Sequence, residues 1–196
     1  MNISQIVRKL AEFLDRKDST REILVQNARD IIRHSKDALK HMYLGNMSES
    51  RAVLEKMRKL CAELKSLVKE YPDLLYGGLM VNALTEYIEA EIVYSILTRG
   101  IDIPAPEDLD VDPVPYVLGL ADALSELRRF ILEYLRRGDV ESAEKLLNCM
   151  EEIFLEISTL QYPEGLLPGF RRKCDIIRRL IDETKSDIIF VKTRRK

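Results

Sequence analysis

Two pairs of acidic residues in the middle of the chain have a spacing that could bind a metal ion. Glu86 and Glu89 lie three residues apart, and Asp122 and Glu126 lie four apart. On an α-helix each spacing places both side chains on one face, about 60° apart for the first pair. Four carboxylates on two helices suffice to bind Mg²⁺ or Mn²⁺, which are hard cations that prefer oxygen ligands. Such an ion can activate water and stabilise charge on a phosphodiester under attack.

The first acidic pair has no basic neighbour along the chain. Lys69 is the last basic residue before it and Arg99 is the next one after it, while Glu91 is expected on a different helix face. Carboxylates in an otherwise apolar helix require partners, and a divalent cation is one kind of partner. Spacing alone leaves a second interpretation open, in which both pairs belong to acidic solvent-exposed faces and Arg129 pairs with Glu126.

A row of basic residues precedes the acidic pairs. Its members recur at helical positions i, i+4, i+7 and i+11 and therefore share one face; they are Arg29, Arg33, Lys36 and Lys40. Such a row could contact nucleic-acid phosphates in a salt-dependent and sequence-independent way. An ordinary solvated surface, partly neutralised by nearby aspartates, explains the same pattern equally well.

Apolar residues recur with helical periodicity over nearly the whole sequence, and we find no convincing strand–turn–strand pattern. We expect one all-α domain over residues 1–196, a bundle of about seven helices. The expected helices span residues 3–15, 19–45, 48–70, 73–100, 115–137, 140–160 and 168–184. Ser19 is expected to cap the second in a capping box with Glu22, Gly138 to end the fifth, and Asp139 to cap the sixth. The fourth should be buried because it is apolar around most of its circumference, with Gly77 and Gly78 permitting a close approach to a neighbour.

Composition narrows the class of protein further. Hydrophobic residues make up 46% of the 196, which is enough for a core, and a net charge of −2 excludes a uniformly basic nucleic-acid-binding surface. The three cysteines are odd in number and lack metal-site spacing, which favours reduced thiols. No apolar run approaches the roughly 20 residues needed to span a bilayer. We therefore expect a cytoplasmic protein with no membrane association.

Three segments together resemble the translin superfamily. They are EYIEA at residues 86–90, YVLGLADALSEL at residues 116–127 and ARDIIRHSK at residues 28–36. The resemblance extends in helix order and spacing over nearly the whole chain. Acids at Glu86 and Asp122 resemble the branch of translin-associated factor X, since translin-like chains usually lack them, and the compact length suits an archaeal-type homologue.

The resemblance implies a fold, an activity and partners. Chains of this branch form hollow, roughly octameric all-α barrels and act as metal-dependent endoribonucleases on single-stranded RNA. Glu86, Glu89 and Asp122 match the family's catalytic acids, and Glu126 matches a neighbouring acid of the same pocket. The implied cofactor is Mg²⁺ or Mn²⁺. The implied partners are single-stranded or short RNA, or single-stranded DNA, and further copies of the chain.

This sequence departs from the family just before the first acidic pair. The family's basic, aromatic and histidine-bearing segment is replaced by LLYGGLM at residues 74–80. We therefore expect RNA contacts on the basic row that begins at Arg29. Two rival functions remain: a non-catalytic, translin-type oligomer that binds nucleic acid, and a helical scaffold whose acids are merely solvated.

Overall fold

A computed structural model describes residues 2–194, and these form seven α-helices with no β-strand. The helices are α1 (Ile3–Tyr43), α2 (Met47–Leu67), α3 (Gly78–Arg99), α4 (Pro106–Leu109), α5 (Pro113–Arg137), α6 (Val140–Ile157) and α7 (Phe170–Arg194). Two short 3₁₀ turns, Val68–Glu70 and Pro72–Leu74, connect α2 to α3. The expected all-α fold is confirmed.

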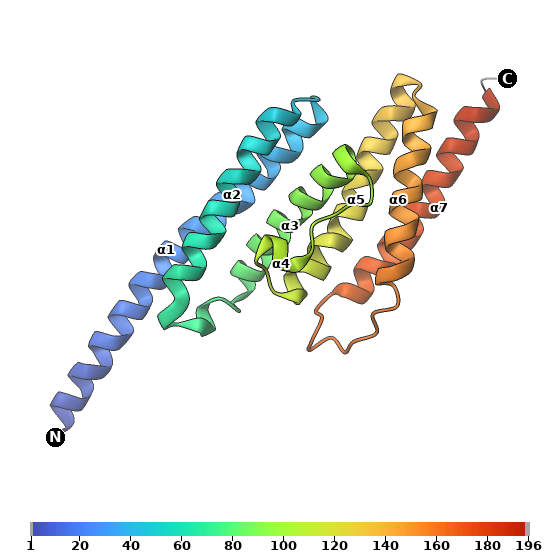
Figure 1. Cartoon of the computed structure of the whole chain (residues 1–196). Helices are drawn as coiled ribbons and strands as arrows, with labels where there is room; N and C mark the ends of the chain where they lie inside the picture. Colours follow the sequence, from blue (N-terminus) through green and yellow to red (C-terminus); the bar gives the residue numbers. More distant parts are fainter. Residues whose placement is uncertain (1, 195–196) are drawn as a thin grey trace.

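The long helices lie roughly side by side in a layered bundle. Figure 1 shows α1 and α2 along one edge, α3 and α5 in the middle, and α6 and α7 along the other edge. Helix α3 packs against α1, α2 and α5, and α5 packs in turn against α6 and α7. The central position explains why α3 is the apolar helix, with buried residues such as Tyr87, Ile88 and Ile92 on several faces.

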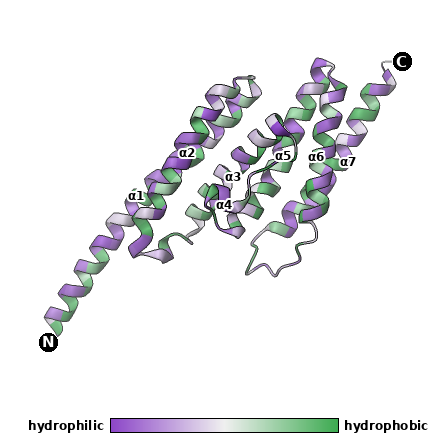
Figure 2. Ribbon diagram, viewed as in Figure 1, coloured by the Kyte–Doolittle hydropathy of each residue, from purple (hydrophilic) through white to green (hydrophobic). Residues whose placement is uncertain are grey.

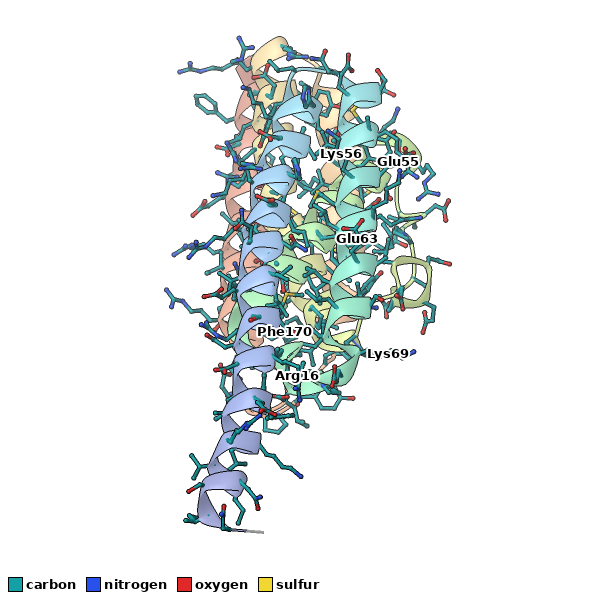
Figure 3. All side chains as sticks on the ribbon, turned by 90° about the vertical axis from the view of Figure 1, so that its left-hand side faces the viewer. Arg16, Glu55, Lys56, Glu63, Lys69 and Phe170 are labelled. Atoms are coloured by element: carbon teal, nitrogen blue, oxygen red, sulfur yellow. The ribbon has the colours of Figure 1, made fainter. Side chains whose placement is uncertain are left out.

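The predicted break between the first two helices is wrong, because α1 continues without interruption from Ile3 to Tyr43. Ser19 does not cap a new helix. Its hydroxyl donates a hydrogen bond to the main-chain oxygen of Asp15 at 2.9 Å, one turn earlier, and therefore fits within a continuous helix. The N-terminal turns of α1 consequently extend beyond the other helices, as Figures 1 and 3 show.

Other boundaries differ by smaller amounts. The proline-rich segment contains the short helix α4, and α5 begins at Pro113, whose missing N–H costs nothing in a first turn. Gly138 ends α5 with φ of 81°, and the Asp139 side chain accepts a hydrogen bond from the Ser142 N–H at 3.0 Å, as the sequence predicts. Helix α7 continues ten residues beyond its expected end at residue 184.

The close approach between helices occurs at a different glycine from the expected ones. Gly78 is the first residue of α3 and has no atom within 4 Å of the position where a Cβ would lie. At Gly119 of α5 a Cβ would lie 2.6 Å from the Thr85 main-chain oxygen and 2.8 Å from the Ile88 Cβ. The absence of a side chain at Gly119 therefore lets α3 and α5 pack closely, directly beside both acidic pairs.

The thiols of Cys61, Cys149 and Cys174 are free. None of the helices formed by residues 2–194 has the length and apolar character needed to cross a membrane.

Candidate functional site

The packing of α3 against α5 brings the two acidic pairs together. Glu86 and Glu89 lie on α3, and Asp122 and Glu126 lie on the adjoining turns of α5. The pKa of Glu89 is raised to about 8, mainly by burial and then by the charges of Glu86, Asp122 and Glu126 in that order of size. Charges exert such an effect only at close range, so the four carboxylates form one group, which we call the acidic cluster.

Glu86 occupies the side of the cluster that faces α1. Burial is the main cause of its raised pKa, and Asp122 adds to the shift, whereas Ser35, Lys36 and Lys173 oppose it. The Ser35 hydroxyl of α1 also donates a hydrogen bond to the Glu86 main-chain oxygen at 3.0 Å. Helix α1 therefore fixes this part of α3 and places one lysine near the acids.

Asp122 has a partner that the sequence did not reveal. The Lys173 ammonium of α7 donates a hydrogen bond to Asp122 Oδ1, and about 30% of each side chain is exposed. Lys173 lies 51 residues from Asp122. No local pattern indicates this pairing, since it depends on α7 packing against α5.

Glu126 is held by two neighbours. Its carboxylate accepts hydrogen bonds from the Tyr43 hydroxyl at 3.1 Å and from Arg129 Nη1 at 3.0 Å. The Tyr43 ring stacks on Phe130, with centroids 4.2 Å apart, and the Arg129 guanidinium lies 4.8 Å from the Tyr43 centroid. Burial and the Glu126 charge raise the pKa of Tyr43 well above its ordinary value. Tyr43 therefore remains a neutral donor that orients Glu126.

The basic row lies on the exposed surface of α1. All four members, Arg29, Arg33, Lys36 and Lys40, are exposed. Arg33 Nη2 pairs with Asp30 at 3.0 Å, and Lys36 is close enough to lower the pKa of Glu86. The row therefore passes beside the acidic cluster at Lys36, its third member, and extends along α1 on both sides of that point.

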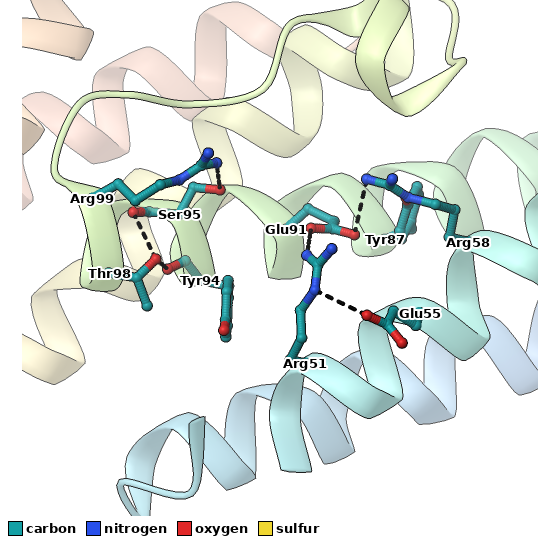
Figure 4. A network of polar contacts seen from close by, with 9 residues as sticks. All are labelled: Arg51, Glu55, Arg58, Tyr87, Glu91, Tyr94, Ser95, Thr98 and Arg99. Carbon is teal, nitrogen blue, oxygen red and sulfur yellow. Dashed lines mark hydrogen bonds and ion pairs between the residues drawn. The ribbon is translucent and has the colours of Figure 1, made fainter. Parts of the chain in front are cut away.

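Glu91 lies on another face of α3, as the sequence predicts, in a cluster of a different kind (Figure 4). Its side chain is only 3% exposed and lies 3.7 Å from Arg51 Nη1 and 3.8 Å from Arg58 Nη2, both on α2. Arg58 Nε also donates a hydrogen bond to the Tyr87 hydroxyl at 3.3 Å. We call these four residues the Glu91 network. They adjoin a cavity of about 630 Å³ bounded by α2, α3 and α4.

The acidic cluster has donors suited to a divalent cation, but their present orientations do not form a complete site. Over residues 2–194, no three His, Cys, Asp or Glu side chains are arranged to hold a metal ion. Asp122 is turned toward Lys173, and Glu126 toward Tyr43 and Arg129. The chemistry nevertheless fits: carboxylate oxygens are the ligands that Mg²⁺ and Mn²⁺ prefer, and after burial the charges of three neighbouring acids contribute to the raised pKa of Glu89.

Known proteins are similar to this chain in sequence and in fold. No protein-family profile matches the chain. An uncharacterized protein of Methanocaldococcus jannaschii is 27% identical over 183 residues, which cover 92% of this chain and 80% of that protein.

Solved structures of C3PO proteins match over almost the entire chain. The crystal structure of AfC3PO is 31% identical with a TM-score of 0.88, covering 96% of this chain and 98% of that one. AfC3PO in complex with duplex RNA is 30% identical with the same TM-score, covering 96% and 97%. Apo-NeC3PO, at 23% identity, a TM-score of 0.86 and coverage of 94% and 96%, shares the fold. The chain therefore belongs to the translin superfamily, which includes the translin and factor X proteins of C3PO.

Proposed function

We propose that this protein is a metal-dependent endoribonuclease of the factor X type, with its reaction centre at the acidic cluster. The observation that supports the proposal is the convergence of four carboxylates in the space between α3 and α5, where burial and then the charges of neighbouring acids raise the pKa values of Glu86 and Glu89. A protein gains no stability from such mutual repulsion. The arrangement is therefore best explained by a cation that binds there during function.

Glu86, Glu89, Asp122 and Glu126 would hold Mg²⁺ or Mn²⁺, which activates water and neutralises charge on the scissile phosphate. The chain's own residues prepare this centre. Tyr43 and Arg129 orient the Glu126 carboxylate through hydrogen bonds. Burial and the neighbouring acids raise the pKa of Glu89 to about 8, and a bound cation would favour its charged carboxylate form.

RNA is the substrate that we propose, because AfC3PO, which is 30% identical, has been solved in complex with duplex RNA. The basic row of Arg29, Arg33, Lys36 and Lys40 provides exposed positive charge beside the acidic cluster. Phosphate contacts made by such a row would hold RNA of any sequence. We propose single-stranded or short RNA as the preferred substrate, with duplex RNA and single-stranded DNA as the comparison ligands.

Self-association into a hollow oligomer remains part of the proposal. An apolar stripe on the projecting turns of α1, formed by Ile3, Val7, Leu10 and Leu14, is more than half exposed, and Figure 2 shows it uncovered by other helices. An isolated helical segment of this length is marginally stable, so contact with another copy would stabilise it. Sedimentation velocity should detect an oligomer, and a monomer at micromolar concentration would contradict this part.

A cleavage assay tests the catalytic proposal. Labelled single-stranded and duplex RNA would be incubated with the protein and Mg²⁺ or Mn²⁺, comparing wild type with Glu89→Gln. We expect at least about a hundredfold loss of cleavage in the variant, since one ligand of the charge-stabilising group is removed. Glu133→Gln on α5 is the matched control, because Glu133 pairs with Arg136 and Arg137, away from the cluster. Equal activity of wild type and Glu89→Gln would refute the assignment.

The second candidate function is RNA binding without cleavage. It is favoured by the present orientation of Asp122, which already pairs with Lys173. It predicts that RNA is retained in a salt-dependent manner and remains intact with either metal ion. Joint replacement of Arg29 and Arg33 by alanine should then weaken retention while leaving the protein folded.

A further inference from the structure

Lys173 is the basic residue most closely associated with the acidic cluster. It donates a hydrogen bond to Asp122 and opposes the upward pKa shifts of both Glu86 and Glu89. The other lysines of α7 whose ion pairs are resolved bind acids of α6: Lys185 pairs with Glu151 and Lys192 pairs with Glu144. Lys173 thus differs from them in being directed at α5 and its carboxylates.

The charge balance of the site depends on three basic side chains of the chain itself. Lys173 pairs with Asp122, Arg129 with Glu126, and Lys36 acts on Glu86. Four carboxylates and three basic groups leave one net negative charge. One divalent cation would convert this to one net positive charge, which a single RNA phosphate neutralises. Two divalent cations would leave three positive charges on the site, and such an excess opposes binding of the second ion.

We propose that the Lys173 ammonium takes the place of a second divalent cation, so that each chain binds one divalent ion. Lys173 is then a positioning residue. It holds Asp122 through one oxygen and leaves the other oxygen of that carboxylate, with Glu86 and Glu89, to the metal. This inference rests on the proposed function, because it presupposes that the acidic cluster binds a divalent cation.

Counting bound Mn²⁺ by electron paramagnetic resonance tests the inference without any cleavage measurement. Lys173→Met removes the charge while nearly preserving the length of the side chain. Wild type should bind one Mn²⁺ per chain. Lys173→Met should bind a second ion, or bind the first with a dissociation constant at least about tenfold lower, because a competing positive charge has gone. Lys185→Met on the same helix is the matched control and should behave as wild type.

A conservative variant separates charge from packing. Lys173→Arg keeps a cation beside Asp122 and should bind one Mn²⁺, whereas a purely structural role for the lysine predicts no gain of metal in Lys173→Met. Two ions bound by wild type, or one ion at unchanged affinity in Lys173→Met, would overturn the inference and leave the proposed function intact. If wild type binds no more Mn²⁺ than Glu89→Gln does, both the inference and the proposed function would be overturned.

Discussion

Two faces of α3 carry carboxylates in opposite electrostatic situations. On one face, Glu91 is almost fully buried and lies within 3.8 Å of two arginines of α2. On the other face, Glu86 and Glu89 meet Asp122 and Glu126 of α5, and burial together with neighbouring acids raises the pKa values of Glu86 and Glu89. The first arrangement is balanced within the chain and joins α2 to α3. The second has more acids than basic partners, and our proposal assigns that excess negative charge to the binding of a cation.

The contrast also shows that burial alone does not distinguish an acid proposed to bind metal from an acid that pairs with arginines within the chain. Desolvation is the largest cause of the raised pKa of both Glu89 and Glu91. The difference lies in the remaining causes, since Arg58 and Arg51 lower the pKa of Glu91 whereas three further acids raise that of Glu89. The identity of the neighbours therefore separates the two roles.

Replacement of Gly119 by alanine should have the largest effect, because it should disturb the acidic cluster and leave the Glu91 network in place. A Cβ at this position would lie 2.6 Å from the Thr85 main-chain oxygen, so α5 must move away from α3. We expect the free energy of unfolding to fall by about 3 kcal/mol, the upper part of the range for overpacked cores. Mn²⁺ affinity should fall as well, because Asp122 and Glu126 move with α5 while the Glu91 network, formed by α2 and α3, does not.

Urea unfolding and Mn²⁺ titration measure these two effects. Gly78→Ala is the matched control, because a Cβ there meets no atom within 4 Å and the residue begins a helix. It should leave both quantities unchanged or add a few tenths of a kcal/mol of stability. Wild-type metal affinity in Gly119→Ala would show that the spacing of α3 and α5 does not assemble the acidic cluster.

The sequence predicted which acids share a face of α3 better than it predicted which residues of other helices contact them. Helical spacing placed Glu86 with Glu89 and separated both from Glu91, because the period of the helix is a local property. The closure of α5 at Gly138 and the cap at Asp139 were predicted for the same reason. Lys173 and Tyr43 were missed, since they reach the cluster from helices 51 and 83 residues away along the chain. Those contacts depend on packing, which no local pattern encodes.

The incorrect break near Ser19 has a related cause. Serine followed three residues later by Glu22 matches a capping box, but the Ser19 hydroxyl bonds backward to Asp15 instead. The capping motif is therefore not used as a cap, and the helix continues through it. At Gly119 the error was one of omission: the sequence drew attention to Gly77 and Gly78, while the glycine that contacts a neighbouring helix lies within an apparently ordinary helical run.

Replacing one acid on each face of α3 should change the free energy of unfolding in opposite directions. Glu91→Gln keeps the size of the side chain but leaves Arg51 and Arg58 without their counter-charge. We expect a loss of about 2 kcal/mol of unfolding free energy, less than for a fully buried pair because both arginines are nearly half exposed. Glu55→Gln, which removes an exposed partner of Arg51, should cost less than about 0.5 kcal/mol. Equal losses in the two variants would mean that burial of Glu91 confers no special role.

Glu89→Gln should instead stabilise the protein without metal, by about 1 kcal/mol at pH 8, and should weaken the dependence of stability on pH. The pKa of Glu89 is about 8 in the folded chain and near its ordinary value of 4.5 when unfolded, so the folded state binds the proton more tightly. Stability is therefore highest below pH 4.5, falls as the pH rises toward 8 and then levels off. Urea midpoints measured from pH 5 to 8 should decrease for wild type and for Glu133→Gln, and should decrease less for Glu89→Gln, in which, of the carboxyl groups that the structure describes, only Glu86 and Glu91 keep raised pKa values. The control separates this effect from a general loss of carboxylate charge, because Arg136 and Arg137 hold the pKa of Glu133 at about 2, below the range titrated. A parallel decrease in all three proteins would assign the pH dependence to other groups, and the acidic face of α3 would then be as well balanced as the face that carries Glu91.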